Sequence, residues 1–453
     1  MRVGAASVGG LAIVAALALG LPAAAQQTPA RPAAVAQAPD DATYKAAFEE
    51  TLRKPGDPAT LLRYAELSIK VGNLEGAISA LERLLLIEAD QPRVKLELGV
   101  LYYRLGSYEA ARGYLESARS SAQTTPEIKA RADQMLAEVD EKTAKSQFSG
   151  EVLFAMRYSN NANSGPGGSI RSAGVTTVAT PAVSGRSDFS ALTASAIRHR
   201  YDLGRQDAGE FESDLSLFAS RQFQISEANV MLADFTTGPR TKPFDGWADD
   251  VSLKPFFTGR YLAVHDLTTY WAWGSGLEAT SPLGPSSQVA LTILSRRREF
   301  VNNADVPTNT NSSGTEFVPS LEFRSDLTPA LSMSFSTSMT RYIAAVGSET
   351  YTEFGVSAAL SWRFRDPLGI NGRTWLASVN AGVARATYDE PDTAVDANVV
   401  RRQNDVNFGL ILGIPLDDTL TLVAQGTYVR RDASISNYTY DAITALTGVS
   451  WRF

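Results

Sequence analysis

Cysteine is absent from the 453 residues, and histidine occurs only twice, as His199 and His265. The lack of cysteine excludes disulfide bonds and thiolate metal sites, and two histidines are too few for a histidine-rich metal centre. Such a chain suits the oxidising cell envelope, although missing cysteine alone does not assign a compartment. An excess of basic charge is also missing, because the formal net charge is -7 at pH 7. We therefore expect no nucleic-acid partner.

No hydrophobic run reaches the roughly 20 apolar residues that a membrane-spanning helix needs. The N-terminus carries Arg2, an apolar run from Leu11 to Leu21 and the small residues Ala23, Ala24 and Ala25. These are the parts of a secretory signal peptide, so we predict residues 1–25 as a signal peptide cleaved after Ala25. A retained signal anchor is the alternative. If the mature chain enters a membrane, it must do so with strands.

Composition divides the rest of the chain. Residues 26–41 are rich in Ala, Pro and Gln without apolar periodicity, which predicts a disordered linker. Strong helix formers dominate from Thr43 to about Lys145, whereas short alternating runs with Ser, Thr, Gly and aromatic residues follow from about Phe148. The change predicts a helical domain over residues 42–146 and a β domain over residues 147–453.

The helical region repeats at a spacing of 34 residues, which is the length of a tetratricopeptide unit. The spacing holds for proline, turn, small and apolar positions alike: Pro58, Pro92 and Pro126; Gly72 and Gly106; Ala77 and Ala111; Leu81 and Leu115. Small residues let two antiparallel helices approach closely, and glycine fits the turn between them. We predict two such units, with a leading helix over residues 43–53 and a capping helix over residues 126–141.

Stacked units of this kind form a curved surface whose concave side is lined by the first helix of each pair. The repeat register places five residues in that groove: Glu66, Lys70, Arg93, Tyr103 and Arg104. One interpretation is a groove that binds a partner protein. The other is an ordinary solvated helix face.

Alternation of apolar and polar residues marks the β region. From Leu331 to Thr340, large apolar residues share one face and serines share the other, and residues 353–364 alternate in the same way. In the run 210–217 the polar face carries Glu212 and Asp214, so we expect it to line a wet lumen. A strand that crosses a bilayer needs this pattern over ~9–11 residues, with its apolar side chains outward. A soluble β-sandwich also shows alternation and is the alternative.

Fourteen candidate strands follow one another, beginning near residues 149, 187, 209, 227, 250, 267, 287, 315, 330, 351, 375, 404, 419 and 440. With an even count the longest connections, 160–186, 302–314 and 389–403, all fall on the outer face. Gly448, Trp451 and the terminal Phe453 are similar to the C-terminal assembly signal of outer-membrane barrels. We therefore predict a multidomain α + β chain, in which all-α tetratricopeptide-type repeats precede an antiparallel transmembrane β-barrel of about fourteen strands.

Catalytic residues are scarce. A hydrolase needs a general base, and the available histidines are His199, near a predicted periplasmic turn, and His265, near a loop. We predict no enzymatic activity, no cofactor and no metal site, and no nucleotide-binding loop is visible. The arginines Arg296, Arg297 and Arg298 lie at a predicted strand end, where they form either a site for anionic lipopolysaccharide or phosphate groups or a solvated rim.

Four segments carry a family resemblance: LELGVLYYRLGSYEAARGYLESA, PEIKARADQMLAEVDEK, YSNNAN at Tyr158–Asn163 and TGPR at Thr237–Arg240. Through them, residues 90–453 resemble the surface lipoprotein assembly modulators, a family of outer-membrane translocons. The family shows Tyr-Asp-Ser-Asn-hydrophobic-Asn at the barrel opening. This chain keeps Tyr158, Asn161 and Asn163 but has Ser159 in place of the Asp.

The resemblance implies an outer-membrane protein that moves or displays a client lipoprotein or secreted protein, with the repeats engaging the client in the periplasm. Barrel-assembly machinery and outer-membrane lipids are the other expected partners. An exopolysaccharide-export porin is the chief alternative, because such porins also join repeats to a barrel, although they usually have more repeats and a wider barrel. A diffusion porin with the repeats as a scaffold is the third possibility.

Overall fold

The computed structural model describes residues 41–453, apart from 205–208, 245 and 247. The described chain divides into a helical unit that ends at Gln147 and a barrel unit that runs from Phe148 to Phe453. The predicted signal peptide, and all of the predicted linker except its last residue, lie outside the described residues. None of the described helices is both long enough and apolar enough to span a membrane.

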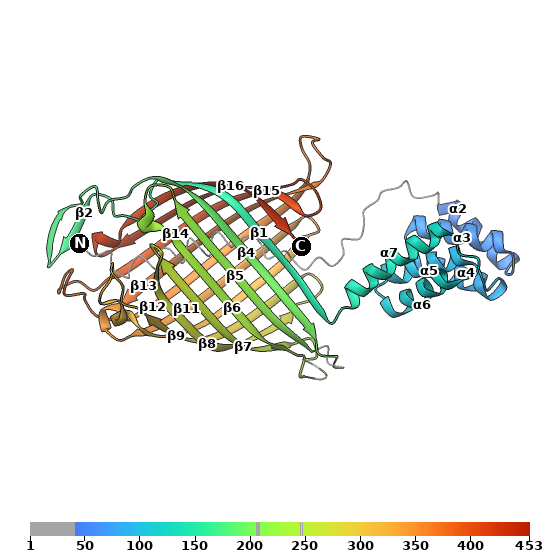
Figure 1. Cartoon of the computed structure of the whole chain (residues 1–453), viewed down its shortest axis with the longest axis horizontal. Helices are drawn as coiled ribbons and strands as arrows, with labels where there is room; N and C mark the ends of the chain where they lie inside the picture. The colour runs from blue at the N-terminus through green and yellow to red at the C-terminus, as the bar shows by residue number, and fades with distance from the viewer. Residues whose placement is uncertain (1–40, 205–208, 245, 247) are drawn as a thin grey trace. The chain divides into compact units, whose positions relative to one another are not determined.

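The helical unit consists, within the described chain, of six helices: α2 (Asp41–Arg53), α3 (Pro58–Val71), α4 (Leu74–Ile87), α5 (Pro92–Arg104), α6 (Tyr108–Ser120) and α7 (Pro126–Thr143) (Figure 1). Three of them begin at the prolines of the repeat, where the missing N–H costs no helical hydrogen bond. Gly72 and Gly106, with φ of 81° and 76°, end the first helix of each pair in the left-handed region. The two predicted units are confirmed as α3–α4 and α5–α6.

Small residues bring the helices of each pair together. In the first pair, Ala65 and Ala77 are buried. In the second pair, Gly99 of α5 faces Leu115 of α6, and a Cβ added at Gly99 would lie only 2.6 Å from the Leu115 side chain. Leu115 is fully buried, so it has little room to move aside. The close approach of α5 and α6 therefore depends on glycine at position 99.

Gly99→Val is expected to destabilise the helical unit, since the added side chain overpacks the α5–α6 contact at a cost of about 1–3 kcal/mol. The measurement is thermal unfolding of the detergent-solubilised full chain, followed by circular dichroism at the helix wavelength. Gly113→Val is the matched control, because Gly113 is also helical but has nothing within 4 Å of an added Cβ. Equal melting temperatures for the two variants would contradict the close approach.

Fourteen antiparallel strands close into a barrel, in which β1 and β4 to β16 pair in chain order and β16 pairs with β1 (Figure 1). The strands are β1 (Ser146–Ser159), β4 (Asp188–Asp202), β5 (Glu210–Gln222), β6 (Val230–Arg240), β7 (Ser252–Val264), β8 (Leu267–Pro282), β9 (Ser287–Phe300), β10 (Gly314–Thr328), β11 (Leu331–Ala344), β12 (Tyr351–Arg365), β13 (Thr374–Tyr388), β14 (Arg402–Pro415), β15 (Leu420–Ala433) and β16 (Tyr440–Arg452). Each predicted start lies within three residues of the observed start. Closure excludes the soluble β-sandwich.

The outer surface of the barrel carries an apolar belt. Large side chains on it are about half exposed, such as Phe154 at 60%, Trp273 at 57% and Phe354 at 58%. The residues that alternate with them point inward and include charged side chains such as Glu212 and Asp214, which lie in an ion-pair network on the inner face. An apolar belt outside and charges inside are the pattern of a barrel in lipid. The fold therefore fits an outer-membrane protein.

The two ends of the barrel differ in their connections. We call the end where β1 begins and β16 ends the proximal end, and the opposite end the distal end. The three longest connections, 160–187, 301–313 and 389–401, are all distal, as the strand count predicts. The connection after β1 contains a separate hairpin, formed by β2 (Ser169–Ser172) and β3 (Val175–Val178). The distal end is thus the end with the elaborate loops.

Candidate functional site

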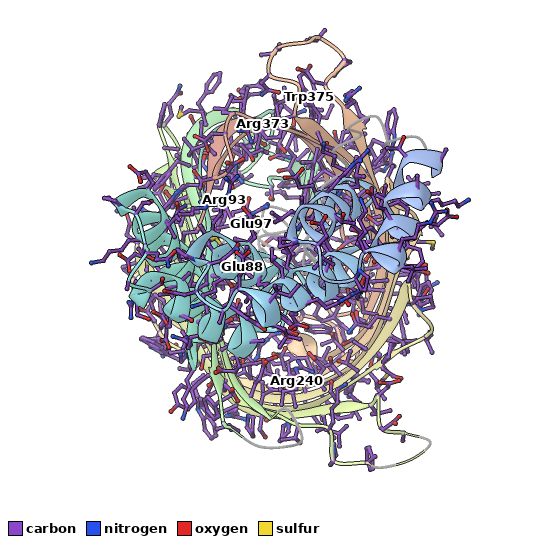
Figure 2. All side chains as sticks on the ribbon, turned by 90° about the vertical axis from the view of Figure 1, so that its right-hand side faces the viewer. Glu88, Arg93, Glu97, Arg240, Arg373 and Trp375 are labelled. Atoms are coloured by element: carbon purple, nitrogen blue, oxygen red, sulfur yellow. The ribbon has the colours of Figure 1, made fainter. Side chains whose placement is uncertain are left out.

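The predicted groove residues are mostly accessible. Glu66 and Lys70 on α3, and Arg93 and Arg104 on α5, are exposed. Arg93 projects from the surface of the helical unit (Figure 2). Tyr103 differs, because it is half-buried and its ring meets Tyr108 of α6 edge-on at 5.6 Å. Four residues can therefore meet a partner directly, and their binding role stays a prediction.

The repeats are joined by a contact that sequence reasoning missed. Glu82 of α4 accepts hydrogen bonds from the hydroxyls of Tyr102 at 2.7 Å and Tyr114 at 3.0 Å, and the two tyrosine rings stack with centroids 5.4 Å apart. The bond to Glu82 raises the pKa of Tyr102 to about 12, so its hydroxyl stays a donor at physiological pH. No local pattern marks Glu82, because its partners lie 20 and 32 residues later. The contact ties the first unit to the second.

The barrel-opening motif organises the first distal connection. Asn161 donates to the carbonyls of Gly165 at 2.9 Å and Asp441 at 3.0 Å. Asn163 accepts from the Arg186 backbone N–H at 2.8 Å and donates to the Ser184 carbonyl at 3.0 Å. These bonds hold the two ends of the connection together beside β16. The motif YSNNAN therefore shapes this distal loop.

The hairpin β2–β3 is fastened to two other distal connections. Arg171 Nε lies 2.7 Å from Asp396 Oδ2, and the Asp396 side chain is 1% exposed. The backbone N–H groups of Ala173 and Gly174 donate to the carbonyls of Ala394 at 3.0 Å and Val395 at 2.8 Å. Asn437, between β15 and β16, donates to the Arg171 carbonyl at 2.9 Å. The hairpin is therefore held to connections 389–401 and 434–439.

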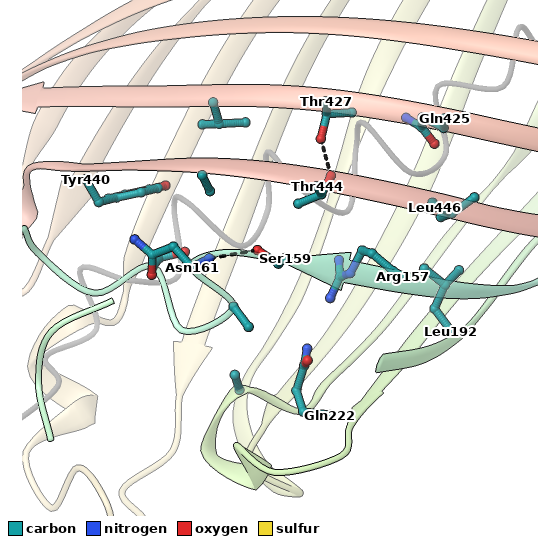
Figure 3. A pocket seen from close by; sticks show the side chains of 15 residues that line it. Arg157, Ser159, Asn161, Leu192, Gln222, Gln425, Thr427, Tyr440, Thr444 and Leu446 are labelled. Carbon is teal, nitrogen blue, oxygen red and sulfur yellow. Dashed lines mark hydrogen bonds between the residues drawn. The ribbon is translucent and has the colours of Figure 1, made fainter. Parts of the chain in front are cut away.

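A pocket opens on the inner face beside this loop (Figure 3). Its walls are inward-facing residues of β1, β4, β5, β15 and β16 together with the start of the 160–187 connection, and it is partly open to solvent. Arg157 of β1 is its charged residue, and neutral polar residues surround it: Ser159, Asn161, Ser164, Gln222, Gln425, Thr427 and Thr444. Leu192, Val429 and Leu446 are among its apolar residues. Sequence reasoning missed it, because β1 and β15 meet only on closure.

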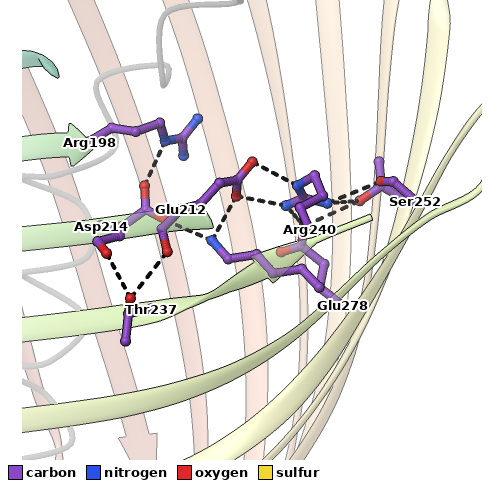
Figure 4. Close-up of polar contacts among 10 residues, drawn as sticks. Arg198, Glu212, Asp214, Thr237, Arg240, Ser252 and Glu278 are labelled. Carbon is purple, nitrogen blue, oxygen red and sulfur yellow. Dashed lines mark hydrogen bonds and ion pairs between the residues drawn. The ribbon is translucent and has the colours of Figure 1, made fainter. Parts of the chain in front are cut away.

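Ion pairs run along the inner face from β4 to β8 (Figure 4). Arg240 is the hub, with Nε 2.8 Å from Glu212 and Nη2 2.6 Å from Glu278. Lys254 Nζ lies 2.8 Å from Glu212 and 3.0 Å from Asp214, and Arg198 Nε lies 2.6 Å from Asp214. We call these six residues the β4–β8 ladder. Three cations face three carboxylates, so the ladder is neutral, and the TGPR motif supplies its hub.

The arginine triplet does not form a rim. Arg296 and Arg298 point inward, are 6% and 17% exposed, and both pair with Glu316 of β10. Arg298 also lies over the rings of Tyr342 at 4.8 Å and Tyr270 at 5.7 Å. Arg297 points outward and pairs with Glu299 at 2.6 Å. The solvated-rim interpretation is wrong for Arg296 and Arg298, because strand alternation sends alternate residues of the triplet into the barrel.

The remaining predicted residues make packing, ion-pair or backbone contacts. The His199 ring stacks on Phe148 at 4.4 Å, and His265 Nδ1 lies 2.6 Å from Asp305 in a distal loop. Trp451 lies near Phe453, with ring centroids 4.9 Å apart. Phe453 exchanges backbone hydrogen bonds of 2.9 and 3.1 Å with Gly150, so the terminal residue extends the β1–β16 pairing. Gly448 pairs with Ala155, where an added Cβ would lie 2.3 Å from the Phe154 carbonyl oxygen.

Comparisons with known proteins match the helical region. Residues 34–96 and 72–134 match a tetratricopeptide repeat family. Among solved structures, PcrH in complex with the chaperone-binding region of PopD is 23% identical, and the match covers 22% of this chain and 79% of that one with a TM-score of 0.21. The Yersinia enterocolitica type III secretion translocator chaperone SycD is 17% identical, with coverages of 22% and 72% and a TM-score of 0.21. The Sgt2 tetratricopeptide domain from Aspergillus fumigatus is 15% identical, with coverages of 22% and 67% and a TM-score of 0.20.

No curated protein matches the chain. The resemblance to the surface lipoprotein assembly modulators is not tested by these matches and stays a prediction. Tetratricopeptide repeats generally bind protein partners, and the closed barrel fits an outer-membrane protein. The chain therefore combines N-terminal tetratricopeptide repeats with a fourteen-stranded barrel of the outer-membrane type.

Proposed function

We propose that this protein is an outer-membrane, translocon-like protein that moves or displays a client lipoprotein or secreted protein at the cell surface. In this proposal the helical unit lies in the periplasm and engages the client, and the barrel provides the passage or the platform. The observation that carries it is the union in one chain of protein-binding repeats and a closed barrel. Barrel-assembly machinery would insert the barrel into outer-membrane lipid.

The inner face suits the passage of a polypeptide. The β4–β8 ladder pairs its charges internally, so this wall offers little net charge to hold a passing chain. On β11 to β13 the inner face carries small hydroxyl side chains, among them Ser336 bonded to Ser357 and Ser361 bonded to Ser378, each at 2.7 Å. Small side chains leave the lumen width open on that side. A wall without strong binding allows a client both to enter and to leave.

The function needs no chemical step. A transported or displayed client can gain its driving free energy by folding outside the cell or by binding other partners, so we propose no enzymatic activity and no cofactor. His199 packs on Phe148 at the barrel surface, and His265 pairs with Asp305 in a loop. These contacts support structural roles for the two histidines better than catalytic ones.

Polysaccharide export is supported less well. Aromatic side chains do form a band on the inner face near the distal end, in which Tyr270 meets Phe300, and Tyr351 lies between Tyr342 and Tyr388. A sugar ring needs an open aromatic face on which to stack. Tyr270 and Tyr342 are only 2% and 3% exposed, and Arg298 lies over both rings. The band therefore serves packing better than it would serve sugar binding.

Reversing two groove charges tests the role of the helical unit. Lys70→Glu with Arg104→Glu is expected to reduce surface display of clients at least several-fold, because both side chains are exposed in the predicted groove. The measurement is labelling of intact cells with a membrane-impermeant reagent, followed by quantification of labelled envelope proteins. Lys129→Glu with Arg131→Glu reverses two exposed charges on α7 and is the matched control. Equal display in both double variants would contradict a role for the groove.

A further inference from the structure

Arg157 faces the lumen without a carboxylate partner in the described part of the chain. Its Nε donates to Ser190 Oγ at 3.2 Å and its Nη2 to Ser220 Oγ at 3.0 Å, and both partners are neutral hydroxyls. A guanidinium carries five N–H donors, so these bonds leave three of them available. The Arg157 guanidinium projects from β1 into the pocket on the inner face (Figure 3).

Six other inward arginines are arranged differently. Each of the six has a carboxylate within ion-pair distance: Arg198, Arg240, Arg260, Arg296, Arg298 and Arg431. Arg431 and Asp405, for example, are 4% and 6% exposed and lie 2.5 Å apart. Taking a cation away from bulk water is costly unless an anion compensates it. The barrel supplies that anion for these six arginines and supplies only hydroxyls for Arg157.

The pocket around Arg157 is positive by one charge. Of the fifteen residues that line it, Arg157 is charged and none is acidic. The amides of Gln222 and Gln425 and the hydroxyls of Thr427 and Thr444, which are bonded to each other, are neutral hydrogen-bonding groups from β5, β15 and β16. Leu192 and Leu446 add an apolar surface beside them. A ligand matched to this wall carries one negative charge, a polar amide or hydroxyl, and an apolar group.

We propose that this pocket binds a carboxylate group on a polypeptide client, with Arg157 as its charge partner. A carboxylate is planar and accepts two parallel N–H bonds from one guanidinium, so a single arginine neutralises it in a defined orientation. A phosphate dianion would need a second cation, which the lining of the pocket does not provide. The neighbouring amides would bind the backbone of the client, and Leu192 and Leu446 would contact an apolar side chain.

The proposal that this pocket binds a carboxylate rests on the pocket alone. The proposal that the carboxylate belongs to a polypeptide rests on the proposed function. An acidic sugar carries the same charged group, so the test below includes one. The peptide is proposed because the proposed function brings a polypeptide client into the lumen.

Ligand-observed NMR on the full chain in detergent micelles tests the site with four probes: N-acetyl-leucine, its neutral carboxamide, glucuronate and inorganic phosphate. We expect N-acetyl-leucine to bind best, and Arg157→Gln to weaken its binding tenfold or more. Arg324→Gln is the matched control, because Arg324 is another inward-facing arginine but pairs with Glu322 at 2.6 Å. That variant should bind as the unchanged protein does. Gel mobility with and without heating verifies that each variant is a folded barrel.

Equal binding of N-acetyl-leucine and its carboxamide would overturn the carboxylate site, as would unchanged binding by folded Arg157→Gln. Tighter binding of glucuronate than of N-acetyl-leucine would overturn the polypeptide source. Tighter binding of phosphate would overturn the single-charge argument. The surface-labelling measurement reports separately on client display, so loss of the proposed function and loss of this site give different results.

Discussion

Removal of residues 42–145 is expected to reduce surface display of clients to the level of cells that lack the protein, while the barrel still folds. The two units have separate buried clusters, one confined to barrel residues and two confined to the helices. Pairing of β1 with β16 closes the barrel without any residue before Ser146. The deletion should therefore remove client engagement and leave a folded barrel that has no client to pass on.

Two measurements check this expectation. Surface labelling of intact cells reports display, and heat-dependent gel mobility reports whether the shortened barrel is folded. Unchanged display with a folded barrel would contradict the proposed function. Ion current through the intact chain in a planar bilayer addresses the alternatives, because a channel that conducts only when a client is present would support a translocon. A large, steady current would instead support a diffusion porin in which the repeats are a scaffold.

Glu316→Gln is expected to lower the stability of the barrel by about 3–5 kcal/mol, which is the typical cost of breaking a buried ion pair. Glu316 is 1% exposed and is shared by Arg296 and Arg298. Glutamine keeps the shape of the side chain but removes the charge, so two guanidinium groups lose their carboxylate. Asp234 is the remaining carboxylate near Arg296, at 3.7 Å, and it already pairs with Arg260 at 2.6 Å.

Glu322→Gln is the matched control on the same strand. Glu322 also faces inward and pairs with Arg324 at 2.6 Å, but the two side chains are 40% and 53% exposed. An exposed pair contributes at most about 1 kcal/mol, so this variant should remain near the stability of the unchanged protein. Denaturant unfolding of the detergent-solubilised chain compares the two. If Glu316→Gln lowers the free energy of unfolding no more than Glu322→Gln does, burial of the Glu316 ion pairs adds nothing to the stability of the barrel.

Alternation is sufficient to predict the strands because it is a local signal. The two-residue period assigns each side chain to one face, and turn residues interrupt it between strands. For this reason the run from Leu331 to Thr340 predicts a strand by its own residues, and it lies within β11. The same holds for the helices, where the spacing of Pro58, Pro92 and Pro126 marks three helix starts.

The alternation pattern does not predict which residues of neighbouring strands contact each other. Arg296 and Arg298 have the pattern of rim charges because the sequence does not show that Glu316, 20 and 18 residues later, lies beside them on the next strand. The tie between Glu82 and its two tyrosines was missed for the same reason. In each case strand register or helix packing determines which residues become partners. Register and packing depend on many weak contacts along the whole element.

The sequence by itself determined the helical repeats, the fourteen strands, and which faces of those strands are apolar, since each rests on spacing within a short segment. Only the tertiary structure decided which charges are paired and which are left for a ligand. Cysteine is absent and histidine occurs only twice, and arginine supplies the inward-facing cations named above apart from Lys254. Arg157 and Thr427 lie 270 positions apart, and they share a pocket because closure of the barrel sets the first strand beside the last two.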